Sequence, residues 1–165
     1  MTLLLEEETE VNFDFDYKQV ANDVIYTALD QLQFPYDVEI SLTITDSEGI
    51  HAINKEFRQI DAPTDVLSFP MLDYDTPGEF DFLDDNDDAF NPESGECILG
   101  DIVLNTERII SQAADFGHSV KREYAFLIAH SMMHLFGFDH MSEAEAADME
   151  ARQEHVLAEL GITRE

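Results

Sequence analysis

The sequence is poor in cysteine, in basic residues and in long apolar runs. Its single cysteine, Cys97, cannot form a disulfide within the chain, which is typical of proteins from a reducing compartment. No apolar stretch approaches the roughly 20 residues of a membrane-spanning helix. The N-terminal MTLLLEEETE also lacks the basic start of a signal peptide. We therefore expect a cytoplasmic protein without membrane contact.

Basic residues are scarce relative to acidic ones. There are 8 Lys and Arg against 37 Asp and Glu, for a formal net charge of −29. This excess argues against broad electrostatic attraction to nucleic acid or to anionic membranes, and it predicts good solubility. The chain is 44% hydrophobic, so it can bury a core and is not a disordered acidic polymer. A length of 165 residues predicts a single domain, residues 1–165.

Hydrophobic periodicity predicts a mixture of helices and strands. Apolar residues recur every four positions from about 16 to 33, as in an amphipathic helix, and alternate with polar residues from 38 to 44, as in a half-buried strand. Similar patterns predict strands at 2–6 and 98–105, an extended segment at 61–70, and helices starting near residues 46, 105, 119 and 142. Because the strands and helices do not alternate strictly, we predict an α+β fold with a small mixed sheet and about five helices.

The segment 73–96 has a composition of its own. It holds ten Asp and Glu, no Lys or Arg, two prolines and two glycines, so we expect an acidic surface loop. A D-x-N-x-D pattern that begins at Asp84 has the early spacing of a calcium-binding loop. However, Ala89 and Gly95 occupy the positions of its turn glycine and its bidentate glutamate. A solvated acidic loop is therefore the better interpretation.

Three of the six histidines lie in HSMMHLFGFDH, residues 130–140. His130 and His134 are four residues apart, so on a helix they share one face with Cβ atoms roughly 5–6 Å apart. Gly137 can end the helix in a left-handed conformation, which lets His140 turn back as a third ligand. Neutral imidazole suits Zn²⁺, and three protein ligands leave a position for water, as in catalytic sites. The pattern predicts one Zn²⁺ per chain, on a central helix and the turn after it.

The histidine spacing and the glycine match the metzincin protease motif H-E-x-x-H-x-x-G-x-x-H. In that motif the glutamate is the general base, and here Ser131 replaces it. A serine hydroxyl cannot act as a carboxylate near neutral pH. The pattern therefore indicates a hydrolytic metal site that acts on a different bond.

At this point the chain resembles the YbeY family of bacterial ribosomal-RNA maturation endoribonucleases. The histidine run is similar to the family signature H-G-x-L-H-L-x-G-[YF]-D-H, except that Ser131 and Met133 stand where glycine and leucine are usual. INKEFRQIDAPTDVLSFP at 53–70 and LGDIVL at 99–104 resemble two further family segments, and the acidic loop 73–96 is inserted between them. The resemblance covers the chain from the first strand to the last helix.

This resemblance implies a single-strand-specific, metal-dependent endoribonuclease. The expected roles are 16S rRNA 3′-end maturation and ribosome quality control. Its metal is expected on the three histidines, and its key arginine is Arg58. The implied partners are single-stranded ribosomal RNA, small-subunit ribosomal proteins and an assembly GTPase.

The chemistry of phosphodiester cleavage agrees with these assignments. Charge builds on the non-bridging oxygens, and the Arg58 guanidinium can hold two of them. Lys55, one helical turn earlier, is a further candidate for substrate binding. Two alternatives remain open. One is a metallopeptidase-like hydrolase with a base from elsewhere. The other is a non-catalytic, metal-stabilised ribosome-assembly factor, in which Cys97 or Asp101 would close the metal site as a fourth ligand.

Overall fold

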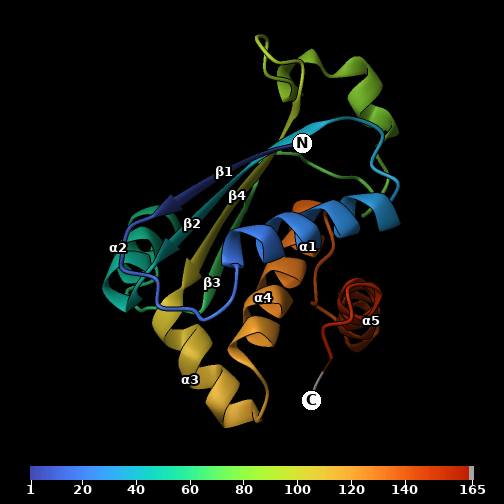
Figure 1. The fold of residues 1–165 in the computed structure, drawn as a ribbon. Coiled ribbons are helices and arrows are strands. Elements are labelled where there is room, and N and C mark those ends of the chain that lie inside the picture. The colour runs from blue at the N-terminus through green and yellow to red at the C-terminus, as the bar shows by residue number, and fades with distance from the viewer. Residues whose placement is uncertain (164–165) are drawn as a thin grey trace.

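The computed structural model describes residues 1–163, and they form one sheet with helices on both faces (Figure 1). The strands are β1 (Thr2–Glu7), β2 (Val38–Thr45), β3 (Val66–Pro70) and β4 (Cys97–Asn105). The helices are α1 (Tyr17–Gln31), α2 (Ser47–Arg58), α3 (Thr106–Phe116), α4 (Val120–Leu135) and α5 (Glu143–Glu159). No helix among these described residues is long and apolar enough to cross a membrane.

The sheet is mixed, in the order β1-β2-β4-β3. β1, β2 and β4 run parallel, and β3 pairs with β4 in the antiparallel sense. The α+β prediction of a small mixed sheet with about five helices is confirmed. Only the second half of the expected extended segment 61–70 is a strand, because only Val66–Pro70 lies beside β4.

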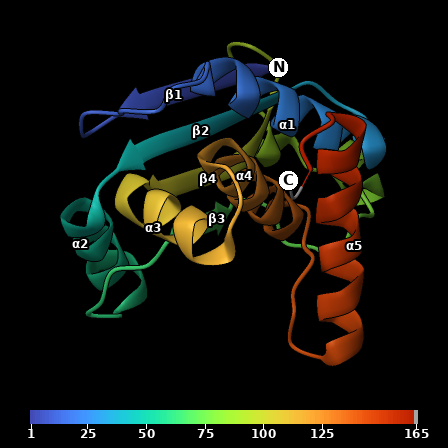
Figure 2. The same cartoon turned by 60° about the horizontal axis from the view of Figure 1, so that its bottom comes forward.

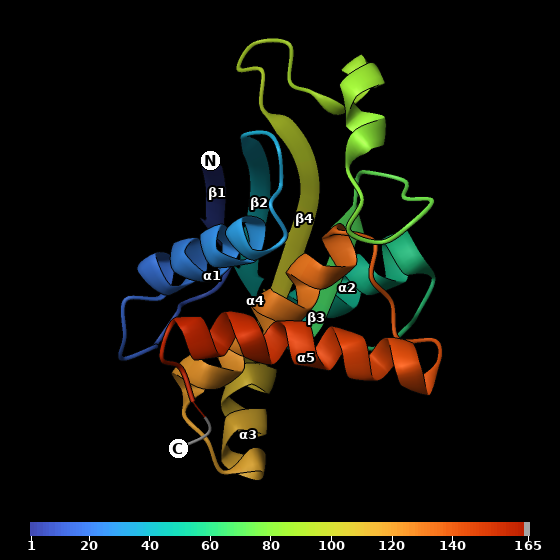
Figure 3. The same ribbon diagram turned by 90° about the vertical axis from the view of Figure 1, so that its right-hand side faces the viewer.

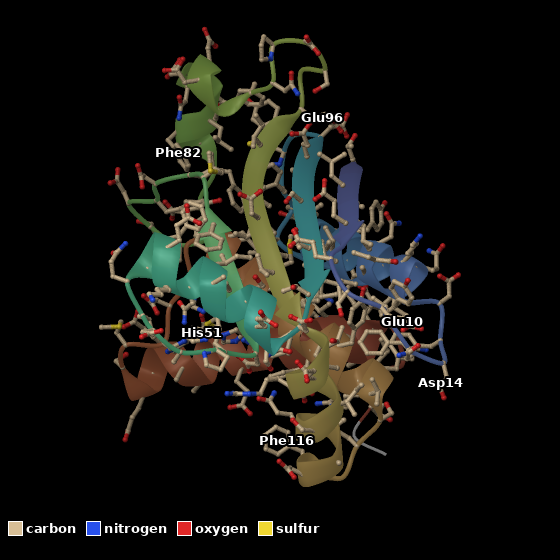
Figure 4. All side chains as sticks on the ribbon, turned by 90° about the vertical axis from the view of Figure 1, so that its left-hand side faces the viewer. Glu10, Asp14, His51, Phe82, Glu96 and Phe116 are labelled. Atoms are coloured by element: carbon tan, nitrogen blue, oxygen red, sulfur yellow. The ribbon has the colours of Figure 1, made fainter. Side chains whose placement is uncertain are left out.

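Alternation along the strands explains why both faces are covered. On β2, Val38, Ile40, Leu42 and Ile44 are buried and join the main core beneath α1 and α4. Figure 3 shows α1, α4 and α5 on this side of the sheet. Figure 4 shows α2 over the opposite face of the sheet. There it contacts β3 and β4 through a small cluster of Ile50, Leu67 and Val103.

Helix α4 lies at the centre of the molecule. It lies between the sheet and the helices α1, α3 and α5 (Figure 2). Because of these contacts, most of its side chains are buried. Ser119 caps its first turn by accepting a hydrogen bond from the backbone N–H of Arg122, at 3.1 Å. The buried Arg122 guanidinium donates to Glu154 at 2.7 Å and to the Ile162 carbonyl at 3.1 Å, which ties α4 to α5 and the chain after it.

The segment 73–96 contains two short 3₁₀ helices, at Asp81–Asp85 and Asp87–Ala89. It projects beyond the end of the sheet, where Phe82 and Glu96 are labelled in Figure 4. Although it is strongly acidic, its Phe80 and Leu83 are buried in the main core. The Gly78 backbone N–H also donates to the Phe136 carbonyl at 3.0 Å. Apolar side chains therefore anchor this acidic segment beside the end of α4.

Candidate metal centre and active site

His130 and His134 project from the last turns of α4 on one face, as the i, i+4 spacing predicts. Their Nε2 atoms lie 3.2 Å apart, and the ring centroids are 4.7 Å apart. Both residues are partly buried, whereas most of the helix around them is packed into the core. Two imidazole nitrogens thus share one small space at the helix terminus.

Gly137 turns the chain back toward these histidines. Its φ is +93°, a backbone conformation that residues other than glycine rarely adopt. A Cβ at this position would also lie 2.7 Å from the Tyr74 ring. The Phe138 backbone N–H returns to the Met133 carbonyl at 3.0 Å, which closes the turn. This turn places the His140 ring so that its centroid lies 5.2 Å from that of His134.

The structure thus brings together the three histidines that the sequence predicted as ligands. One nitrogen from each ring can be chosen so that all three lie within 4.8 Å of one another. Among residues 1–163, no other set of three or more histidine, cysteine or acidic side chains meets this condition. Three imidazoles at this separation fit a zinc-class ion, which takes nitrogen ligands at about 2.0–2.1 Å.

Burial keeps two of these imidazoles in the neutral form that binds metals. It lowers the pKa of His130 to about 4, with further lowering from the neighbouring His134 and His140. Burial also lowers the pKa of His134, against a raising effect of its hydrogen bond with the Phe138 carbonyl. Neither ring has to lose a proton near neutral pH before it can coordinate a cation.

The opposite ring nitrogens of both helix histidines are held by the protein. His134 Nδ1 lies 3.0 Å from the Phe138 carbonyl oxygen, so Nδ1 carries the proton and Nε2 keeps its lone pair. His130 Nδ1 lies 2.7 Å from the side-chain amide of Gln153, a residue of α5 that is only 3% exposed. Sequence reasoning missed Gln153. The available signal was a glutamine on the same helix face as Met149 and Val156.

A cavity of about 560 Å³ opens in front of the histidines. Arg58, at the end of α2, lines it together with the three histidines, and the positive charge of Arg58 contributes to the lowered pKa of His134. Lys55 is exposed on α2 and is not part of the lining. The other lining residues are Asp65, Val66, Ser68, Pro70, Asp139 and Met141.

Ser131 occupies the position of the metzincin glutamate but serves a different purpose. Its side chain is fully buried and shares a hydrogen bond with the Ser68 hydroxyl of β3. A buried hydroxyl without a partner would be costly, and Ser68 supplies that partner. Ser131 is therefore a packing residue between α4 and β3, and it does not line the cavity.

The two residues considered as a fourth ligand lie elsewhere. Cys97 is fully buried at the start of β4, and burial raises the pKa of its thiol to about 11. Asp101 lines a separate groove on the α2 side of the sheet, with Phe57 and Phe69. Neither residue lines the histidine cavity. Neither residue would therefore close a metal site on the three histidines as a fourth protein ligand.

Comparison with known proteins identifies the family. The family model "Endoribonuclease YbeY" matches residues 4–161. The chain belongs to the YbeY family. A family member from Agathobacter rectalis is 59% identical over 99% of this chain and 100% of its own length. Another, from Lachnoclostridium phytofermentans, is 50% identical over the same shares of the two chains.

A solved structure has the same fold. The solution structure of TM1509 from Thermotoga maritima matches with a TM-score of 0.58 over 96% of this chain and 91% of that one, at 19% identity. Position 131 differs from the glycine of the family signature quoted above. The glycine usual at that position needs no partner, whereas the serine of this chain has one in Ser68.

Proposed function

We propose that this protein is a single-strand-specific, metal-dependent endoribonuclease that acts in the cytoplasm in 16S rRNA 3′-end maturation and ribosome quality control. One observation carries the proposal: Arg58 and the three histidines, which come from separate parts of the fold, line the same cavity. The name shared by the YbeY relatives, endoribonuclease, supports an RNA substrate.

The residues of the cavity divide the work of phosphodiester cleavage. His130, His134 and His140 would hold one zinc-class ion. When bound, such an ion polarises a phosphoryl oxygen and lowers the pKa of a water molecule. Arg58 lines the same cavity and can hold two non-bridging oxygens of the scissile phosphate through its planar fork. It thereby stabilises the charge that develops on these oxygens in the transition state.

The charge of the protein limits how it can hold RNA, and the other partners are those that the family resemblance implies. With a net charge of −29, the chain can attract RNA only through local cations such as Arg58, so we expect few phosphate contacts and a shallow dependence of RNA affinity on salt. Contacts with small-subunit ribosomal proteins or an assembly GTPase would supply the remaining affinity. Lys55, one turn before Arg58, stays a candidate for contacting RNA outside the cavity.

The decisive experiment compares substrates and one ligand variant. Zinc-loaded protein is incubated with a single-stranded rRNA fragment that spans the 16S 3′ end, with the same fragment in a duplex, and with casein. We expect cleavage of the single strand only, and its loss in His134→Ala. Casein hydrolysis, or equal RNA cleavage by His134→Ala, would refute the proposal.

A further inference from the structure

The proposed reaction needs a group that accepts a proton, and none of the residues assigned so far can serve. The Arg58 guanidinium offers donors and no acceptor atom, and the histidines would use their free nitrogens as ligands. Two other titratable side chains line the cavity, Asp65 and Asp139. We propose that Asp65 is a catalytic residue, whose carboxylate accepts the proton of the attacking water. This inference rests on the endoribonuclease function proposed above.

Asp65 sits at a fixed point of the fold, directly before β3. Its carbonyl accepts a hydrogen bond from the Asn105 backbone N–H at 2.9 Å, which fastens it to the end of β4. Its side chain lines the cavity together with His130 and Arg58. The negative charge of Asp65 also raises the pKa of His130, against the lowering effect of burial. Asp65 therefore borders the cavity in which an attacking water would be held.

Three hydrogen bonds orient the Asp65 carboxylate. Oδ1 accepts from the Val66 backbone N–H at 2.8 Å and from the Thr64 hydroxyl at 3.3 Å, and Oδ2 accepts from the Gln112 side-chain amide at 3.3 Å. An ionised carboxylate has about four acceptor positions. One position is therefore left for a water in the cavity, while the other three prevent the group from rotating away.

Gln112 connects Asp65 to a second, buried carboxylate. The same amide nitrogen lies 2.7 Å from Oε2 of Glu123, whose side chain is 3% exposed, and Oε1 of Glu123 lies 2.7 Å from His118 Nε2. An amide NH₂ has two hydrogens, so Gln112 can donate one to each carboxylate. Gln112 therefore fixes the direction of Oδ2 of Asp65 by tying it to the buried Glu123.

Asp139 is placed for a different task. It is exposed, and its Oδ1 accepts a hydrogen bond from the His140 backbone N–H at 2.8 Å. That contact holds the turn that presents His140, so Asp139 is a positioning residue for the third histidine. Asp65 comes from another part of the chain, and the three donors on its carboxylate belong to residues that are not metal ligands.

In the proposed step, water attacks the scissile phosphate. The water oxygen forms a bond to phosphorus while the bond from phosphorus to the leaving ribose oxygen breaks. The electron pair of that bond stays on the leaving oxygen, which takes a proton from solvent. The proton lost by the attacking water passes to Asp65, which releases it to solvent after product leaves. Loss of such a general base costs about 10²–10⁴-fold in rate.

The test uses Asp65→Asn and Asp65→Ala, with Asp61→Asn as a matched control. Asp61 is an exposed carboxylate of the same segment that pairs with His51 and does not line the cavity. We measure zinc content, single-stranded RNA affinity and cleavage rate against pH. Asp65→Asn should keep zinc and RNA binding within about twofold while cleavage falls about 10²–10⁴-fold. Its rate should also no longer rise with pH on the acidic side, whereas Asp61→Asn should match the parent.

Added formate tests the proposed role of Asp65 as proton acceptor in a second variant. It should restore cleavage by Asp65→Ala in a saturable way, because it supplies the missing carboxylate, whereas a purely structural role would not respond. Equal cleavage by Asp65→Asn and parent, loss of zinc in that variant, or no formate rescue of folded, zinc-loaded Asp65→Ala would each overturn the role of Asp65. A parent that leaves RNA intact would instead refute the proposed function itself.

Discussion

Replacing Gln153 with methionine should weaken metal binding without touching a ligand. A cation on His130 Nε2 leaves the ring proton on Nδ1, which must then donate to an acceptor. The Gln153 amide lies 2.7 Å from Nδ1, and a half-turn of the amide places its oxygen there. Methionine has a similar length but no comparable acceptor, and the site is 3% exposed, so water cannot easily replace the amide.

The loss of zinc affinity in Gln153→Met can be calculated from two effects. Loss of an outer partner of a ligating histidine typically lowers metal affinity about 10–100-fold, which corresponds to about 1.4–2.7 kcal/mol. A buried donor left without an acceptor costs about 1–3 kcal/mol. The two ranges agree. We therefore expect Gln153→Met to raise the zinc dissociation constant about 10–100-fold, while Gln153→Glu, which keeps an acceptor, stays within about threefold of the parent.

The assay is competition for zinc against a chromophoric chelator. Gln19→Met serves as the matched control, because Gln19 is exposed on α1 and its side-chain amide donates to Asp23. A nitrogen NMR measurement of the His130 ring would show the proton on Nδ1 in the zinc-loaded parent. If Gln153→Met binds zinc within twofold of the parent, the reasoning about this hydrogen bond is wrong.

Three further predictions concern the same cavity. Arg58→Lys should keep zinc but lose most RNA cleavage, because lysine lacks the bidentate fork; cleavage at the parental rate would contradict a two-oxygen contact. Ser131→Glu should destabilise the protein by more than about 3 kcal/mol, since it buries a carboxylate against Ser68. It should also give no casein hydrolysis; urea unfolding measures the first effect and a casein assay the second. In chelator-treated protein, the lowered pKa of His130 means that the unfolded state binds more protons between about pH 6.5 and 4. The free energy of unfolding of the parent, relative to that of His130→Asn, should therefore be constant above pH 6.5 and fall by at most roughly 3 kcal/mol as the pH approaches 4. Urea unfolding of both proteins across that range measures this difference, and a difference that does not change with pH would contradict the prediction.

Local patterns predicted the helices and the histidine cluster well. The helix predicted from Ser119 to Phe136 is observed as Val120–Leu135, with those two residues as its caps, because its capping and apolar signals lie within the segment itself. The three histidines lie within eleven residues around one glycine, so their meeting depends only on a helix end and a turn. The pairing of β2 with β4 carries no such local signal, because 51 residues separate the end of one strand from the start of the other.

The supporting residues of the site could not be found from spacing alone. Asp65 lines the cavity just before β3, and Gln153 of α5 bonds to His130, so their positions depend on how β3 and α5 pack against α4. The acidic composition of 73–96 also concealed its anchoring role, because charge dominates the count while Phe80 and Leu83 make the buried contacts. Burial of a few side chains, and not average polarity, decides where such a segment lies.

The crossing of α5 over the end of α4 has a consequence for the lifetime of the protein in the cell. α5 is tied to α4 by the Arg122–Glu154 pair and by Gln153 on His130. Detachment of α5 would remove Gln153 from His130 and so weaken a cation on the histidines about 10–100-fold. A cation at a free concentration 100 times its dissociation constant therefore opposes that detachment by about 1.3–2.3 kcal/mol through mass action. Proteases act on the transiently opened chain. Metal-free protein should therefore be degraded faster than metal-loaded protein, and protease digestion of the two forms would measure the difference.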